Sequence, residues 1–137
     1  MKILARILKF TFILYIISLF FFSLYSFKDL SVNLSDRFLG IKTDKIVHFI
    51  IFFPFSFLSF IAFGAYLKRK INNYCIFVLF IFGIIISTIT ETLQILTPLR
   101  SFELLDLLAN YIGIFIGSLL LYIIVNSSKY NRVNRLL

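Results

Sequence analysis

Four stretches of this sequence are apolar over a length that can cross a lipid bilayer, which takes about 20 helical residues. They cover residues 7–27, 46–67, 74–96 and 104–125. Inside a bilayer the backbone has no water to bond, so such stretches fold as helices. Hydrophobic residues fill 61% of the 137 positions, which leaves too little polar surface for a water-soluble domain. The sequence therefore predicts an all-α integral membrane four-helix bundle, built as a single domain over residues 1–137.

The first apolar stretch begins among the positive charges of Lys2, Arg6 and Lys9, as a secretory signal peptide would. Its apolar run is too long for a typical signal peptide, and FFSLYSF offers no small-residue cleavage pattern. We interpret it as a retained transmembrane helix. The loop after it is rich in turn-forming residues, and we expect it at the outer surface with a short interfacial helix over 34–39.

Basic residues are segregated along the chain in a way that predicts its orientation. The N-terminal segment, the loop at 68–70 and the C-terminal segment hold nine basic residues and no acidic ones. The other two loops hold five basic residues together with five of the six acids. Because positively charged segments stay in the cytoplasm, both termini are predicted to be cytoplasmic. The net charge of +8 is divided among these short clusters, which argues against a nucleic-acid partner.

Polar residues from three separate segments are predicted to reach a similar depth near the outer ends of their helices. Glu91 lies five residues before the end of its apolar stretch, which is about 7.5 Å at 1.5 Å rise per residue. His48 and Asn110 lie about one helical turn inside their own stretches. A charged group facing lipid costs about 2.5–3.5 kcal/mol, so these side chains should face the interior of the bundle.

Helical spacing groups the polar residues on common faces. Asp44 and His48, at i and i+4, share a face of the second helix. Glu91 and Gln94, at i and i+3, share a face of the third. The predicted polar pocket on the outer side of the bundle consists of Asp44, His48, Glu91, Gln94, Arg100, Asp106 and Asn110.

The fourth helix carries a narrow stripe made of Asp106, Asn110, Gly113 and Gly117. Its outer half is polar, while the glycines of its inner half have no side chains. Glycines four residues apart allow two helices to approach closely, so Gly113 and Gly117 are predicted to serve helix packing. Asn110 has the alternative role of a hydrogen-bonding link between helices.

Other polar residues also have simpler interpretations. Lys45 and Glu103 fit ordinary charges at the membrane surface, and we favour that interpretation for both. His48 can be read as an interfacial residue that bonds the first loop. Glu91 can be read as the structural partner of Arg100, although a glutamate inside an apolar helix favours a functional role.

Two segments of the chain together resemble the VanZ-like family of small membrane proteins. They are DKIVHF at 44–49 and ETLQILTPLRSFELLDLLANYIGIFIG at 91–117. Leu99 departs from the family pattern, because many relatives have glycine before the arginine. The matching positions are Asp44, Lys45, His48, Glu91, Gln94, Pro98, Arg100, Asp106, Asn110, Gly113 and Gly117.

The resemblance implies an envelope-facing, multi-pass protein of the bacterial cytoplasmic membrane. The founding member of the family is associated with resistance to the lipoglycopeptide teicoplanin in Gram-positive bacteria. Our first hypothesis is a non-enzymatic protein that binds an envelope lipid, a lipid-linked precursor or an amphiphilic drug, with membrane lipids around it. The Arg100 guanidinium would offer a planar fork to a phosphate or carboxylate, and Glu91 and Asp106 would hold that fork.

A second hypothesis is an intramembrane enzyme that acts on a lipid-linked envelope substrate, with His48 and Glu91 as its acid–base pair. The sequence offers no obvious nucleophile, so we rank this hypothesis below binding. A structural or assembly protein, whose charges set helix register, ranks third. Asp44 and His48, with Glu91 or Asp106, have a spacing that permits a metal. A lone histidine among scattered acids is a weak metal signature, so we predict no metal and no cofactor.

Overall fold

The computed structural model of the chain describes residues 2–24, 37–38, 41–71, 74–97 and 102–134. Within these residues, four helical segments are long and apolar enough to cross a membrane. They are Ile3–Leu24, Thr43–Ile71, Cys75–Leu96 and Leu104–Ser127. The architecture is helical, as predicted, and each predicted span has a counterpart in the structure.

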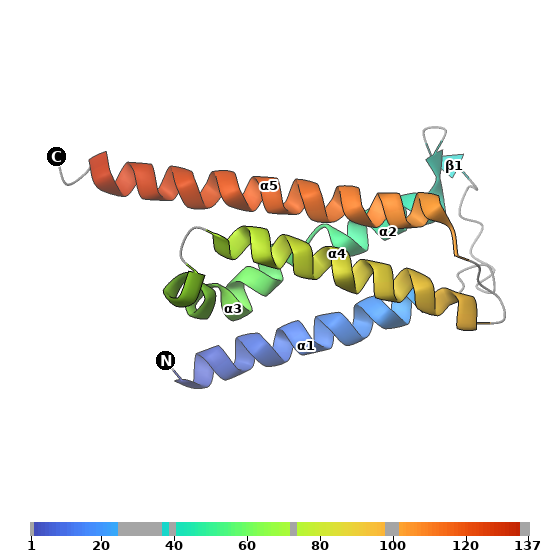
Figure 1. The fold of residues 1–137 in the computed structure, drawn as a ribbon, viewed down its shortest axis with the longest axis horizontal. Coiled ribbons are helices and arrows are strands. Elements are labelled where there is room, and N and C mark those ends of the chain that lie inside the picture. The colour runs from blue at the N-terminus through green and yellow to red at the C-terminus, as the bar shows by residue number, and fades with distance from the viewer. Residues whose placement is uncertain (1, 25–36, 39–40, 72–73, 98–101, 135–137) are drawn as a thin grey trace.

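Three of the spans are continuous helices that follow the prediction closely. They are α1 (Lys2–Leu24), α4 (Cys75–Leu93), which continues into the short 3₁₀ helix η3 (Gln94–Leu96), and α5 (Leu104–Asn134). Helix α5 extends nine residues past the predicted 104–125, because the helical backbone continues through the polar residues beyond the apolar stretch. The start of α1 and the end of α5 lie at the same end of the bundle (Figure 1).

The second span differs from the prediction of one helix over 46–67. It consists of α2 (Thr43–Phe52) and α3 (Phe55–Ile71), separated by a turn at Phe53 and Pro54. Proline has no N–H and its ring clashes with the carbonyl one turn earlier, which breaks the helix at this point.

A side chain from another helix donates a hydrogen bond to a carbonyl group next to this break. The Tyr15 hydroxyl of α1 donates to the Ile51 carbonyl oxygen at 2.7 Å. On the other side of the break, the Ser56 hydroxyl contacts the Ser118 hydroxyl of α5 at 2.7 Å. The break is therefore stabilised by packing against α1, a contact that lies 36 residues away in the chain.

The first loop contains a short β-ladder where we had expected an interfacial helix. Strand β1 (Arg37–Phe38) pairs antiparallel with β2 (Ile41–Lys42), with Arg37 opposite Lys42 and Phe38 opposite Ile41. The expectation of a helix over 34–39 is wrong at residues 37–38, and its other positions lie outside the described residues. Strand β2 leads directly into α2, so the ladder lies at the end of the bundle where α2 begins (Figure 1).

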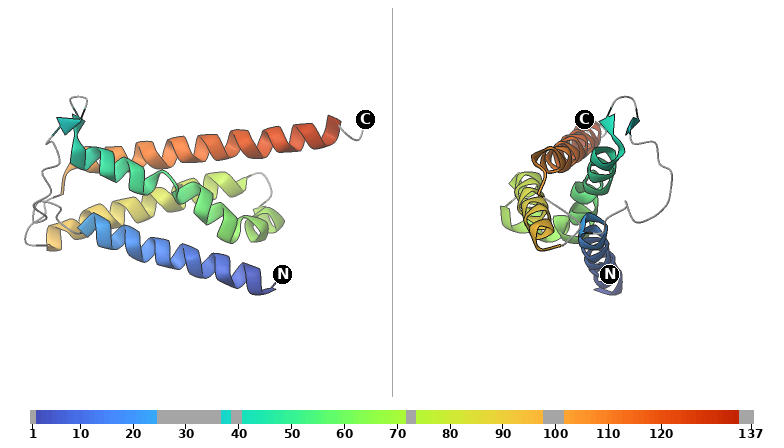
Figure 2. Two further views of the ribbon diagram at one scale, coloured as in Figure 1. Left: turned by 180° about the vertical axis from the view of Figure 1, so that it is seen from behind. Right: turned by 90° about the vertical axis from the view of Figure 1, so that its right-hand side faces the viewer.

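The core of the bundle is apolar and lies around the break between α2 and α3. Its buried side chains are Phe12, Leu19, Phe52, Phe55 and Ile114. Helices α1 and α5 lie on opposite sides of the bundle, with α2, α3 and α4 between them (Figures 1 and 2). Large apolar side chains are exposed on every span, as expected for surfaces that face lipid.

Helix α5 approaches α2 closely at two glycines. A Cβ atom on Gly113 would lie 2.7 Å from the Phe49 carbonyl oxygen, and one on Gly117 would lie even closer to that of Phe53. Both obstacles are backbone atoms, which cannot rotate away. The glycines therefore set the distance between α2 and α5, and this close approach brings the polar ends of the two helices together.

Candidate polar site at one end of the bundle

The candidate site lies where α2 begins, α4 ends and α5 begins, at the opposite end of the bundle from the start of α1 (Figure 1). Most other buried polar residues of the bundle are serines, so the buried charged residues stand out here. Lys45 and His48 come from α2, Glu91 from α4, and Asp106 and Asn110 from α5, and all five are buried.

Lys45 links the start of α2 to the start of α5. Its ammonium group contacts Glu103 Oε2 at 2.5 Å, forms a short ion pair with Asp106 Oδ1, and lies 3.9 Å from Asp44 Oδ2. Our interpretation of Lys45 as an ordinary surface charge is therefore wrong, whereas the side chain of Glu103 is 42% exposed and lies at the rim of the site. A lysine with a short, buried ion pair to Asp106 belongs to the interior network of the site.

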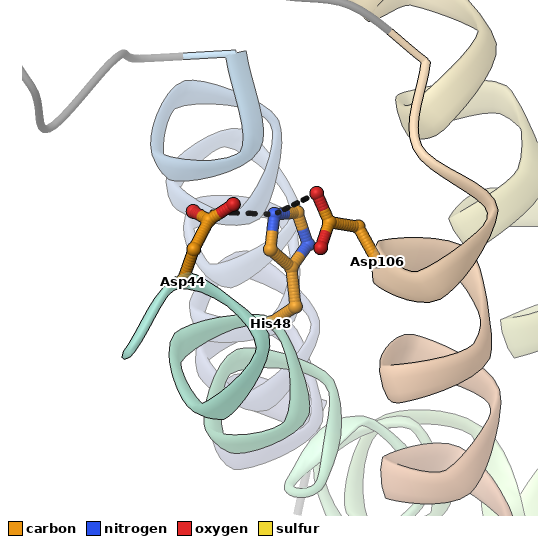
Figure 3. A group of neighbouring side chains, drawn as sticks. All are labelled: Asp44, His48 and Asp106. Carbon is orange, nitrogen blue, oxygen red and sulfur yellow. Dashed lines mark ion pairs between the residues drawn. The ribbon is translucent and has the colours of Figure 1, made fainter. Parts of the chain in front are cut away.

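His48 lies between polar groups of both helices (Figure 3). Its Nδ1 atom is 3.1 Å from Asn110 Oδ1. An amide oxygen only accepts hydrogen bonds, so Nδ1 carries the proton in this arrangement. Its Nε2 atom is directed between two carboxylates, at 3.8 Å from Asp106 Oδ2 and 4.0 Å from Asp44 Oδ1. Both separations are longer than a hydrogen bond.

Glu91 is fully buried near the end of α4. Its Oε1 atom accepts a hydrogen bond from the Glu103 backbone N–H at 3.3 Å. That N–H immediately precedes α5, where the helix dipole favours a negative group. Glu91 thereby ties the end of α4 to the beginning of α5. The described contacts of Glu91 and of His48 involve different residues, so they give no support to the predicted acid–base pair.

Gln94 faces a different helix from the other predicted site residues. Its amide nitrogen donates to the carbonyl oxygen of Ser23 at 3.0 Å and lies 3.2 Å from the Ser23 hydroxyl. Gln94 thus joins η3 to the end of α1. Arg100, the remaining predicted pocket residue, lies outside the described residues.

The carboxyl group of Glu103 lies just before the membrane-spanning part of α5. Its hydrogen bond to Lys45 holds the pKa of Glu103 below its ordinary value, because protonation would remove that bond. Glu103 is therefore ionised at neutral pH and supplies one of the negative charges around the buried ammonium group.

Three of these side chains have the geometry of a metal-binding group. Asp44, His48 and Asp106 each offer one ligand atom, and these atoms lie within 4.8 Å of one another. The i, i+4 spacing of Asp44 and His48 had permitted this arrangement, and the approach of α5 adds the third carboxylate. The structure thus brings three potential metal ligands together, where the sequence had led us to predict no metal.

The geometry can be compared with known families. Residues 8–125 match the VanZ/LLP1 family. The chain belongs to the VanZ/LLP1 family. Comparisons with curated proteins and with solved structures found no match. The matched region contains the whole polar site of this VanZ/LLP1 protein, including Lys45 and Glu103, whose roles the sequence interpretation had missed.

A sequence signal for Lys45 did exist in the VanZ-like pattern, which begins with Asp44 and Lys45 before His48. Spacing alone could not reveal its partners, because Asp106 lies 61 residues away. Ser23 was also missed, since a serine near the end of an apolar helix carries no distinctive signal. Chemically, the VanZ/LLP1 site can bind cations and hydrogen-bond donors through its carboxylates, and the imidazole of His48 can accept a proton at Nε2.

Proposed function

We propose that this VanZ/LLP1 protein binds an amphiphilic molecule of the bacterial envelope at its polar site, and that binding contributes to tolerance of teicoplanin-type lipoglycopeptides. The observation that carries the proposal is the fully buried amide of Asn110 beside the charged network. Its Nδ2 atom has no hydrogen-bond partner among the described residues, although its Oδ1 atom is bonded to His48. A ligand group at this position would satisfy that donor.

A purely structural role explains the network poorly. Removing charged groups from water costs several kcal/mol per ion, and a well-packed apolar pair is often as stable or more stable. An unsatisfied buried donor adds roughly 1–3 kcal/mol of cost. A bundle held together by Phe52, Phe55 and the close glycine packing has no evident need of such a network for stability.

The position of the site fits a ligand that is partly apolar. The site lies near the ends of the membrane spans, and the outer faces of these spans expose large apolar side chains. A lipid tail could remain among those side chains while its head group reaches the carboxylates and Asn110. Among the described residues, the carboxylates of Asp44, Glu103 and Asp106 outnumber the Lys45 ammonium, which favours a head group that carries hydrogen-bond donors or a positive charge.

A second candidate function is an intramembrane enzyme that acts on a lipid-linked envelope substrate. The arrangement of His48 favours it, because Asn110 accepts from Nδ1 and fixes the ring with Nε2 directed between two carboxylates. A general base needs such a fixed imidazole nitrogen. Turnover of a bound lipid-linked substrate would distinguish this function from binding alone.

The proposal is tested by expressing the protein in a sensitive Gram-positive host and measuring growth in teicoplanin, together with drug binding to the purified protein in lipid nanodiscs. Glu91→Gln and Asn110→Leu should abolish any gain in tolerance and weaken binding while membrane levels stay close to wild type. The same result is expected for Arg100→Ala. Thr92→Val is the matched control, because Thr92 is exposed on the same helix as Glu91.

The structure changes one expectation for this assay. As a surface charge Lys45 would matter little, but its buried ion pairs predict that Lys45→Ala loses as much tolerance as Asn110→Leu. If Glu91→Gln and Asn110→Leu lose tolerance only because they disappear from the membrane, the site is structural and the binding proposal fails. Equal affinities of wild type and Asn110→Leu for teicoplanin would also contradict the binding proposal.

A further inference from the structure

We propose that Asp44, His48 and Asp106 bind a divalent transition-metal ion, Zn²⁺ or Mn²⁺, between the first turns of α2 and α5. This inference does not depend on the envelope ligand, because metal binding is measured on the protein alone. The three side chains are shown in Figure 3, where the imidazole ring lies between the two carboxylates. Their ligand atoms lie within 4.8 Å of one another.

The separations around His48 Nε2 suit two ligands of one ion better than a hydrogen bond. The carboxylate oxygens of Asp106 and Asp44 lie 3.8 Å and 4.0 Å from Nε2. Two ligands bound to zinc at about 2.0–2.2 Å, with tetrahedral angles, would lie roughly 3.3–3.6 Å apart. Small inward movements of the two carboxylates would therefore complete the coordination.

The two ring nitrogens of His48 have different surroundings. His48 is 3% exposed, and Nδ1 already contacts Asn110. Among the described residues, Nε2 has no hydrogen bond, only the two more distant carboxylate oxygens. A ring nitrogen placed between two carboxylates, with the other ring nitrogen already bonded, is the arrangement in which a metal ion could bind all three side chains.

The groups behind the three ligands have the character of a second coordination shell. Metal-binding histidines usually donate their other ring N–H to an oxygen, which fixes the ring and its tautomer. Asn110 Oδ1 takes this role at 3.1 Å from Nδ1. Ligating carboxylates are likewise held by hydrogen bonds. Lys45 holds Oδ1 of Asp106 and leaves Oδ2 directed at His48.

The chemistry of the ligands indicates which ions would bind. One imidazole nitrogen with two carboxylate oxygens suits Zn²⁺ or Mn²⁺, whereas all-oxygen sites suit Mg²⁺ and Ca²⁺. Three protein ligands leave a coordination position for water or for another molecule, as in catalytic zinc sites. Three carboxylates around one ammonium, in Asp44, Glu103, Asp106 and Lys45, also favour a cation over an anion.

The experiment uses the full-length protein, purified in detergent, stripped with a chelator and then titrated with Zn²⁺ or with Mn²⁺. Bound metal is measured by mass spectrometry after removal of the free ion, and the melting temperature is recorded in parallel. Wild type should bind one equivalent and melt at a higher temperature with metal, because an ion that binds only the folded state stabilises it. His48→Gln and Asp106→Asn should lose this binding.

Two further variants separate the ligands from their neighbours. Asn110→Ala should weaken metal affinity about 10–100-fold, the usual effect of removing a second-shell partner. Thr92→Val is the control, because Thr92 is exposed on α4 and its hydroxyl bonds the Thr88 carbonyl oxygen, and it should retain the equivalent of metal.

The proposal is overturned if wild type shows no saturable binding of either ion. It is equally overturned if binding is unchanged in His48→Gln and Asp44→Asn, which would show adventitious binding elsewhere on the chain. Asp44 has a side chain 35% exposed, so Asp44→Asn should fold even if changes at the buried ligands do not. The loss of an outer-shell partner alone typically weakens metal binding about 10–100-fold. Asp44→Asn, which changes a ligand, must therefore weaken binding at least about tenfold for the proposal to stand.

Discussion

The contact between α2 and α5 has two halves, one formed by glycines and apolar residues and the other by buried charged and polar residues. Near the break at Pro54, the helices meet backbone to backbone at Gly113 and Gly117, with apolar side chains around them. One or two turns toward the other end, the same helices meet through Lys45, Asp106 and other buried polar residues. The glycine half explains why the helices lie close, whereas the polar half adds charges that this close packing does not require.

The contrast indicates a division of roles within one helix pair. Close apolar packing holds transmembrane helices together without the free-energy cost of burying charged groups, and small residues allow the helices to approach closely. Charged residues inside a membrane are costly and usually mark functional sites. We therefore expect changes in the glycine half to affect folding, and matched apolar replacements in the polar half to affect function.

The largest effect on stability is expected from breaking the buried ion pair on one side only. Asp106→Leu leaves the Lys45 ammonium buried with Glu103 as its remaining close partner, and such changes cost about 3–5 kcal/mol. Unfolding by denaturant in detergent micelles measures the loss. A loss of less than about 0.5 kcal/mol in the free energy of unfolding is typical of surface substitutions. Such a small loss for Asp106→Leu would show that the pair is well solvated and that the comparison is wrong.

A smaller effect is expected in the glycine half. Gly117→Ala places a methyl group against the Phe53 carbonyl oxygen, and overpacking of this kind typically costs about 1–3 kcal/mol. Gly64→Ala is the matched control, because the three atoms nearest to its new methyl group all belong to the side chain of Phe60, which can shift, and not to backbone. The same unfolding measurement should show a clear loss for Gly117→Ala and little change for Gly64→Ala. Equal losses would mean that close packing of α5 on α2 is not the cause.

The smallest effect concerns pH at the rim of the polar half. Lys45 lowers the pKa of Glu103 in the folded protein, so the stabilisation is present above the ordinary pKa of 4.5. It is lost as the pH falls through the lower pKa of the folded state. The melting temperature of wild type should therefore fall toward that of Glu103→Gln as the pH is lowered from 7 to below 4.5. A difference between the two proteins that stays constant over this range would contradict the assignment.

The sequence predicted the four spans because length and apolar composition are local properties. It could not show that the second span is two helices, because a proline can either kink or break a helix. The outcome depends on a contact between Tyr15 and Ile51 of different helices. The spacing of Asp106, Asn110, Gly113 and Gly117 predicted their common face, since helical periodicity fixes it.

Lys45 was misjudged for a similar reason. A lysine at the end of a span usually extends to the membrane surface, and only the approach of α5 places Asp106 beside it. Gln94 has the helical spacing of a pocket residue, but the position of α1 provides Ser23 as its partner. Partners that lie more than sixty residues apart in the chain depend on how helices pack, which no short motif encodes.

The claim that the polar half exists for a ligand is tested most directly by replacing its central ion pair with apolar residues of similar size. Lys45→Met with Asp106→Leu removes both buried charges, and Glu103 can return to water because its side chain is 42% exposed. We predict that the double variant unfolds at least as late as wild type, since apolar replacements of buried ion pairs are often neutral or stabilising. We also predict that it neither binds teicoplanin in nanodiscs nor raises tolerance. A double variant that is stable and still binds and protects like wild type would contradict the account.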